Sequence, residues 1–120
     1  MVKFQRNFTT PEQSKHLLDL GLPEDSADCY FHENRRKELD RIFHCGDKTY
    51  SEQLTTAFTY EIAPNMLPCW SVGRLFEIIA ICLPAEIVIS TDEYPYVLDN
   101  ILQVIEDCIE EFDFSKLEEQ

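Results

Sequence analysis

The stretch LPCWSVGRLFEII, residues 67–79, contains the start of a helix that we expect at the centre of the fold. Ser71 is a residue type that caps helix N-termini, and Trp70 before it can pack onto the first turn. The apolar residues that follow recur at helical spacing: Val72, Leu75, Phe76, Ile79, Cys82 and Leu83. Only Arg74 and Glu77 are charged, and a helix that is apolar nearly all round is usually buried. We therefore predict a buried central helix that runs from Ser71 toward the next proline.

Two further helices are predicted, one on each side of this stretch. The segment TTPEQSKHLLDLGLP starts with a capping box made by Thr10 and Gln13, has a proline at its first helical position, and stops at Gly21. After Pro95, an apolar stripe at helical spacing predicts the last helix: Val97, Leu98, Ile101, Leu102, Ile105, Cys108, Ile109 and Phe112. An acidic tail follows at residues 113–120, and we expect it to fray.

Strands are predicted in the remaining segments. Runs of aromatic and β-branched residues, typical of strands, occur at residues 29–31, 41–45, 56–62 and 85–91. We expect a turn at Gly46-Asp47, a loop at residues 63–68, and an exposed loop or short helix in HENRRKELD, residues 32–40. The chain contains no internal repeat or linker. We therefore predict a single α+β domain over residues 1–120, in which a small antiparallel sheet packs against about three helices.

The composition is that of a folded and strongly acidic protein. Of its 120 residues, 44% are hydrophobic and 12% aromatic, which is typical of a globular domain rather than of a disordered chain. The formal net charge is -13. Because binding to a phosphate backbone depends on Lys and Arg, we expect no direct nucleic-acid binding.

Cysteine usage and apolar segments bear on the location of the protein. The chain has five cysteines, an odd number, and no CxxC motif, and its first residues contain no apolar core of signal-peptide length. These features favour a reducing, cytoplasmic setting. No run of about 18 apolar residues occurs, so we expect no membrane-spanning segment.

Acidic residues are concentrated in the last third of the chain. Residues 86–120 contain eleven Asp or Glu and one Lys, whereas residues 1–85 contain twelve Asp or Glu and nine Lys or Arg. The polar side of the last helix carries no Lys or Arg that could pair with its acids, which are Asp99, Glu106, Asp107, Glu110 and Glu111. This surface either aids solubility alone or binds something basic.

Two kinds of basic partner are compatible with the acidic surface. One is a nucleic-acid-binding protein whose basic groove the surface would occupy. The other is the chain's own RRKELDR segment, in which Arg35, Arg36, Lys37 and Arg41 cluster. That segment could pair with the last helix within one chain or between two chains, so self-association is a further expectation.

Cys69 has the position of a nucleophile at a helix start, as in papain-like proteases. A helix N-terminus favours the thiolate, so the position is chemically suitable. A cysteine protease also needs a histidine base, which follows the cysteine in the papain order. Here His16, His32 and His44 all precede Cys69, and Leu67 and Pro68 replace the papain-type flanking residues. We therefore predict that Cys69 packs in the core, and we assign no catalytic residue.

Metal and nucleotide sites are not indicated either. Cys29, His32, His44 and Cys45 are four potential zinc ligands in one short region, but their spacing matches no common zinc motif. The three glycines are isolated, which excludes the Gly-rich phosphate-binding motifs. We therefore predict no metal site and no cofactor.

Two segments carry a resemblance to a known group. FTTPEQSKHLLDLGLPEDSADCYF and LPCWSVGRLFEII resemble small proteins of unknown function from Bacteroides-type gut bacteria and their phages or mobile elements. Members of that group combine a TTPEQSKxLLxLGLP opening with a PCWSxGxLxEI helix. The resemblance covers less than half of the chain and implies a genomic setting, with no activity, cofactor or site residue attached.

Two functional hypotheses follow. The first is a non-enzymatic, acidic protein-interaction or accessory protein of a phage or mobile element. The alternative is a small-molecule (anion) binding protein or enzyme, with a pocket near the N-terminus of the central helix. In the alternative, Trp70, Ser71 and Arg74 would form the binding site, because helix N-termini and Arg both attract anions.

Overall fold

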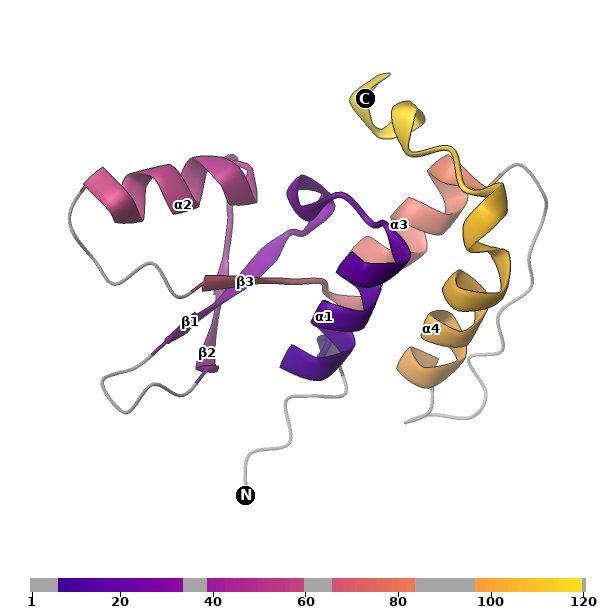
Figure 1. Cartoon of the computed structure of the whole chain (residues 1–120), viewed down its shortest axis with the longest axis horizontal. Coiled ribbons are helices and arrows are strands. Elements are labelled where there is room, and N and C mark those ends of the chain that lie inside the picture. Colours follow the sequence, from indigo (N-terminus) through magenta and orange to yellow (C-terminus); the bar gives the residue numbers. More distant parts are fainter. Residues whose placement is uncertain (1–6, 34–38, 60–65, 84–96, 120) are drawn as a thin grey trace.

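The computed structural model describes residues 7–33, 39–59, 66–83 and 97–119, and these contain four α-helices and three strands (Figure 1). The helices are α1 (Pro11–Leu20), α2 (Tyr50–Thr59), α3 (Val72–Cys82) and α4 (Val97–Cys108). The strands are β1 (Cys29–Glu33), β2 (Leu39–His44) and β3 (Met66–Cys69). The strand order is β2-β1-β3 with both pairs antiparallel. The predicted α+β class with a small antiparallel sheet is confirmed.

Helix α1 has the ends that its sequence predicts. The Thr10 hydroxyl accepts a hydrogen bond from the backbone N–H of Gln13 at 3.2 Å, and the Gln13 side chain accepts one from the Thr10 N–H at 2.9 Å. This reciprocal pair is a capping box. At the other end, Gly21 has φ 112°, a left-handed conformation that residues with a Cβ rarely adopt.

The sheet has two different faces. On one face Cys29, Phe31 and Cys69 are buried, with Phe8, Ile42 and Leu67 packed around them. On the other face the rings of Tyr30 and Phe43 stack with centroids 5.5 Å apart. Phe43 is 39% exposed there. The alternation follows from the period of two along a strand.

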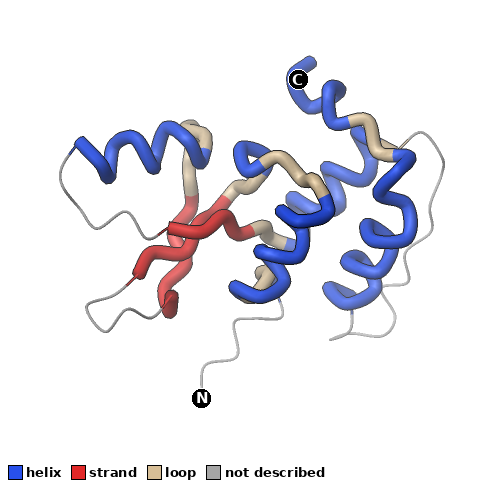
Figure 2. The backbone as a smooth tube through the Cα atoms, in the orientation of Figure 1, coloured by secondary structure: helices blue, strands red, loops and turns tan. Residues whose placement is uncertain are grey.

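The main apolar core lies between helices rather than under the sheet. Its buried residues are Leu17, Leu22, Ala27, Trp70, Leu75, Ile78, Ile79, Cys82, Leu83, Leu98, Ile101 and Ile105. Figures 1 and 2 show α1, α3 and α4 together on one side of the molecule, with the sheet and α2 on the other. Strand β3 leads directly into α3, so the residues between Cys69 and Val72 join the two parts.

One predicted strand is wrong. Residues 56–59 of the expected strand 56–62 belong to α2, and residues 60–62 lie outside the described part of the chain. The start of α2 explains the difference: the Thr49 hydroxyl accepts from the Glu52 N–H at 3.1 Å and donates to the Glu52 carboxylate at 3.3 Å. This Thr-x-x-Glu pattern is a helix-start signal, and it outweighs the strand propensity of the Thr and Phe residues that follow.

The predicted loop at residues 63–68 is also corrected. Met66–Cys69 forms β3, which pairs with β1 and so makes one edge of the sheet. Pro68 suggested a loop because proline cannot donate a ladder hydrogen bond, but an edge strand tolerates it. The ends of HENRRKELD likewise belong to β1 and β2 rather than to a loop or helix. The turn at Gly46-Asp47 is confirmed.

The acidic tail packs against the core. Phe114–Glu119 forms a 3-10 helix beside α3, and the Asp113 N–H donates to the Cys82 carbonyl at 2.9 Å. Phe114 and Leu117 are partly buried against the main core, where we had expected fraying. The predicted strand at residues 85–91 and the expected helix start at Pro95 lie outside the described residues. Among those described, no helix has the length and apolarity needed to cross a membrane.

Two glycine substitutions should change stability in opposite directions. Gly21→Ala should lower the free energy of unfolding by about 1 kcal/mol, because alanine is strained in the left-handed conformation. Gly73→Ala should raise it by up to about 1 kcal/mol, since a helical Cβ there meets no atom within 4 Å. Urea unfolding of both variants measures the difference. Equal effects would contradict the cap assigned to Gly21.

Candidate functional site

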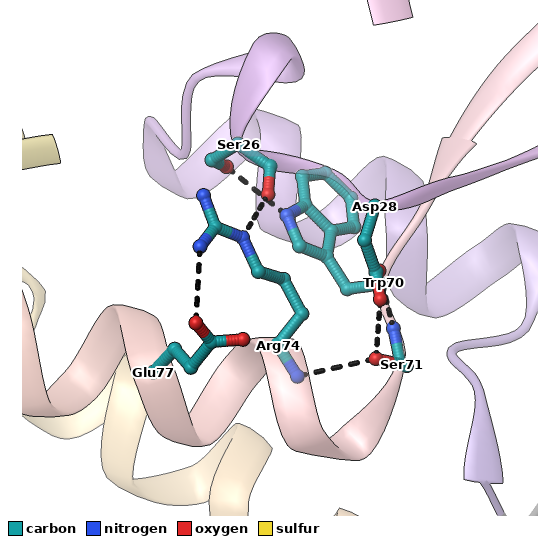
Figure 3. A network of polar contacts seen from close by, with 6 residues as sticks. All are labelled: Ser26, Asp28, Trp70, Ser71, Arg74 and Glu77. Atoms are coloured by element: carbon teal, nitrogen blue, oxygen red, sulfur yellow. Dashed lines mark hydrogen bonds and ion pairs between the residues drawn. The ribbon is translucent and has the colours of Figure 1, made fainter. Parts of the chain in front are cut away.

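Trp70 lies where β3 passes into α3, and its side chain is fully buried. The indole Nε1 donates to the Ser26 hydroxyl at 3.0 Å (Figure 3). The Trp70 backbone N–H donates to the Thr9 hydroxyl at 3.1 Å, and the Trp70 carbonyl accepts from the Thr9 N–H at 3.0 Å. All three polar groups are therefore satisfied inside the protein. Trp70 is sealed in the core, where no ligand can reach it.

Ser71 caps α3 and is itself held by Asp28. The Ser71 hydroxyl accepts from the Arg74 N–H at 3.1 Å, which confirms the predicted cap. The same hydroxyl donates to one Asp28 carboxylate oxygen at 2.5 Å, and the Ser71 N–H donates to the other at 2.9 Å. These contacts use both polar groups of Ser71, so little capacity remains for an anion.

Arg74 connects α3 to the turn before β1. Its Nε donates to the Ser26 carbonyl at 2.7 Å, and its Nη1 lies 3.7 Å from a Glu77 carboxylate oxygen. Figure 3 shows the guanidinium between these two partners. The side chain is 25% exposed. Arg74 is therefore only partly buried, as Ser71 is, whereas Trp70 is fully buried.

A cavity of about 300 Å³ opens beside Arg74. Three segments form it: the end of the turn before β1, the turn after β2, and the first turns of α3. Its lining residues are Asp25, Ala27, Asp28, Cys45, Gly46, Asp47, Lys48, Thr49, Arg74 and Glu77. Four carboxylates and two cationic side chains face it, and this balance does not favour a simple anion. Trp70 and Ser71 are not part of it.

Cys69 does not have the properties of a nucleophile. Its side chain has no solvent exposure, and burial raises the pKa of its thiol from 9.0 to about 12, although hydrogen bonds to Thr9 act in the opposite direction. A buried protonated thiol is unreactive. Its polar neighbour is Thr9, whose hydroxyl lies 3.7 Å from the sulfur. No histidine of the described residues makes a hydrogen bond with the Cys69 thiol.

The four potential zinc ligands do not converge. Cys29 lies opposite His44 in the sheet, and its Sγ is 3.4 Å from the His44 Nδ1. His32 points to the opposite face, where its ring meets the edge of Phe43. Burial, followed by the nearby Asp28 carboxylate, raises the pKa of Cys29. Within the described ranges, no group of three or more His, Cys, Asp or Glu side chains could hold a metal ion.

Helix α4 and the 3-10 turn after it, Ile109–Glu111, expose the acidic side chains. Asp99, Glu106, Asp107, Glu110 and Glu111 are all exposed, while Leu98, Ile101 and Ile105 on the other side are buried. The Glu106 carboxylate lies 3.3 Å from the His16 Nε2 of α1, and Gln103 donates to Asp107 at 2.9 Å. No Lys or Arg of the described residues makes a salt bridge with this surface.

Of the basic segment, the structure describes only the last three residues, 39–41, which belong to β2. Arg41 is in β2, opposite His32 of β1, and Figure 1 places β2 and α4 on opposite sides of the molecule. Arg35, Arg36 and Lys37 lie outside the described residues.

Ser26→Ala should destabilise the junction around Trp70. The substitution leaves the buried indole N–H without an acceptor, which should lower the free energy of unfolding by about 1–3 kcal/mol. Trp70 is the only tryptophan, so its fluorescence reports the unfolding directly. Lys15→Ala, on an exposed position of α1, is the control and should have almost no effect. Equal stability of the two variants would show that the indole contact is not needed.

Thiol labelling should distinguish a core cysteine from a reactive one. At neutral pH, Cys108 should react first, since it is the only cysteine that is not buried, and Cys69 should react only after unfolding. The free energy of unfolding should also fall as the pH rises above 9.0, because the Cys69 thiol ionises there in the unfolded chain but not in the folded one. Peptide mass mapping after brief alkylation identifies the labelled residue, with Cys108→Ser as control. Rapid alkylation of Cys69 would restore the nucleophile hypothesis.

Comparison with known proteins finds no matching family model, no matching curated protein and no matching solved structure. The two surfaces that remain for interpretation are the acidic side of α4 and the cavity beside Arg74.

Proposed function

We propose that this chain is a non-enzymatic protein-interaction module that binds a basic partner through the exposed side of α4. The observation that carries the proposal is the uncompensated charge of this helix and the turn after it. Residues 97–113 contain six acidic residues and no Lys or Arg. A surface of this kind attracts basic proteins and accelerates their association.

The core decides which side of α4 faces outward. Leu98, Ile101 and Ile105 are buried in the main core, so rotation of the helix would expose them at a cost of about 1.5–3 kcal/mol each. The acidic side chains are thereby held in a fixed array on a rigid element. Rigid presentation lowers the entropy lost when a partner binds.

The same array is unfavourable for the isolated protein. Acidic side chains three or four residues apart repel one another, and Glu110 and Glu111 follow the end of α4, where the helix dipole disfavours negative charge. Each effect costs a few tenths of a kcal/mol or somewhat more. A bound cationic surface would remove this repulsion, so the array is better suited to a complex than to the free chain.

The thiol chemistry supports a binding role over covalent catalysis. Burial raises the pKa of Cys69 to about 12 and that of Cys45 to about 11, so neither supplies a thiolate at neutral pH. Because the thiol at the start of α3 was the strongest nucleophile candidate, its loss removes the main argument for an enzyme.

The partner would be a basic surface of a nucleic-acid-binding protein or a second copy of this chain. In the setting that the sequence resemblance implies, the chain would act as a cytoplasmic accessory protein of a phage or mobile element. In self-association, the basic segment of each copy would pair with the acidic side of α4 in the other copy. Both interactions should weaken as salt rises, since exposed charges are screened.

Charge reversal on α4 tests the proposal. A variant with Asp107→Lys and Glu110→Lys should bind basic proteins of the host at least about tenfold more weakly than the original chain at low salt. The matched control carries Glu12→Lys and Asp47→Lys, at exposed positions of α1 and of the turn after β2, which gives the same net charge. Immobilised-chain capture followed by titration of the retained protein gives the affinities, and sedimentation at low and physiological salt reports self-association.

Two results would contradict the proposal. Equal losses in both double variants would mean that only the overall charge matters. The absence of both a retained basic protein and a salt-sensitive dimer would remove the interaction altogether.

A further inference from the structure

The cavity beside Arg74 has walls that are already held in place by contacts within the protein. Asp25 accepts a hydrogen bond from the Ser51 N–H at 2.8 Å, and Asp28 accepts two from Ser71. The Gln53 side chain donates to the Cys45 carbonyl at 3.0 Å and so holds the turn after β2 against α2. The cavity is therefore formed before any ligand arrives, as most small-molecule sites are.

The charged groups of the lining fall into two sets. Asp25 and Asp28 are used to build the walls. The other four charged groups, Asp47, Lys48, Arg74 and Glu77, can still bind a ligand. Asp47 and Lys48 make no side-chain hydrogen bond or ion pair with any part of the described chain. Glu77 is 64% exposed, and its 3.7 Å separation from Arg74 is longer than a hydrogen bond, so both retain groups for a ligand.

We propose that this cavity binds a small zwitterion of the amino-acid type, with its carboxylate on Arg74 and Lys48 and its ammonium on Asp47 and Glu77. The four available groups are two cations and two anions, which is the complement of a molecule that carries one charge of each sign. The cavity volume of about 300 Å³ is at the lower end of the range for ligand sites, and suits a molecule of this size.

Ligands with a single sign of charge fit less well. A simple anion would face four carboxylates, and the net charge of -13 would keep anions away from the surface. A simple cation would meet Arg74 and Lys48. A zwitterion has no net charge, so it is insensitive to the long-range field and gains from all four side chains.

This site is separate from the acidic surface of α4. None of its lining residues belongs to α4, so either proposal can fail without the other. Its residues come from three distant parts of the sequence, which is why the alternative pocket predicted around Trp70, Ser71 and Arg74 retains only Arg74.

Titration with single amino acids tests the proposal. Each of the standard L-amino acids is added in turn to isotope-labelled protein, and amide shifts are recorded at Gly46, Lys48 and Thr49. At least one amino acid should shift these amides saturably. Its N-acetylated form and its carboxamide form each lack one charge, and both should bind at least about tenfold more weakly.

Matched variants keep the test independent of folding. Asp47→Asn and Lys48→Gln lie on an exposed turn, and each should weaken binding of the same amino acid at least about tenfold. Asp19→Asn and Lys15→Gln make the same charge changes on exposed positions of α1 and should leave binding unchanged.

Three results would overturn the proposal. One is the absence of saturable shifts with every amino acid. Another is equal binding of either blocked form, which would indicate a simple anion or cation site. The third is equal weakening by the control variants, which would indicate attraction to the overall charge alone.

Discussion

The burial of Trp70 is the constraint on which the rest of the structure depends. An indole and a peptide group can be removed from water at low cost only when their polar atoms keep hydrogen-bond partners. Here the partners come from two other segments, Thr9 before α1 and Ser26 before β1. A chain segment near residue 9 and another near residue 26 must therefore lie beside residue 70 in the folded protein.

This junction also joins the two parts of the fold. Strand β3 ends at Cys69 in the small cluster under the sheet, and α3 begins at Val72 in the main core between the helices. Trp70 and Ser71 are the only residues between them. Since Asp28 holds Ser71 through two hydrogen bonds, the turn before β1 is attached to the start of α3. Because of that attachment, Asp28 and Arg74 lie close together and both line the cavity.

The two candidate binding surfaces arise from different physical causes. The acidic side of α4 exists because the opposite side of that helix is buried, and its charge is a property of one continuous segment. The cavity exists because three separate segments meet, and its mixture of charges belongs to none of them alone. In the functions proposed above, the first surface would bind a large basic partner and the second a small molecule.

The sequence by itself determined the elements whose signals are local. The capping box at Thr10, the left-handed Gly21, the Ser71 cap and the apolar stripe of α4 each involve residues within one or two helical turns, so periodicity and capping rules predict them. The same stripe also predicts where the excess negative charge lies, because the acidic residues occupy the opposite side of the helix.

Only the tertiary structure decided the rest. Residues 56–59 have strand propensity but continue a helix that begins at the Thr49–Glu52 box, and Met66–Cys69 becomes a strand because β1 offers it an edge. Trp70 and its hydrogen-bond partners are separated by tens of positions in the sequence. The residues that line the cavity are spread over a similar distance. No local pattern records such pairs, because the hydrogen bonds and burial that select them form only when distant segments pack together.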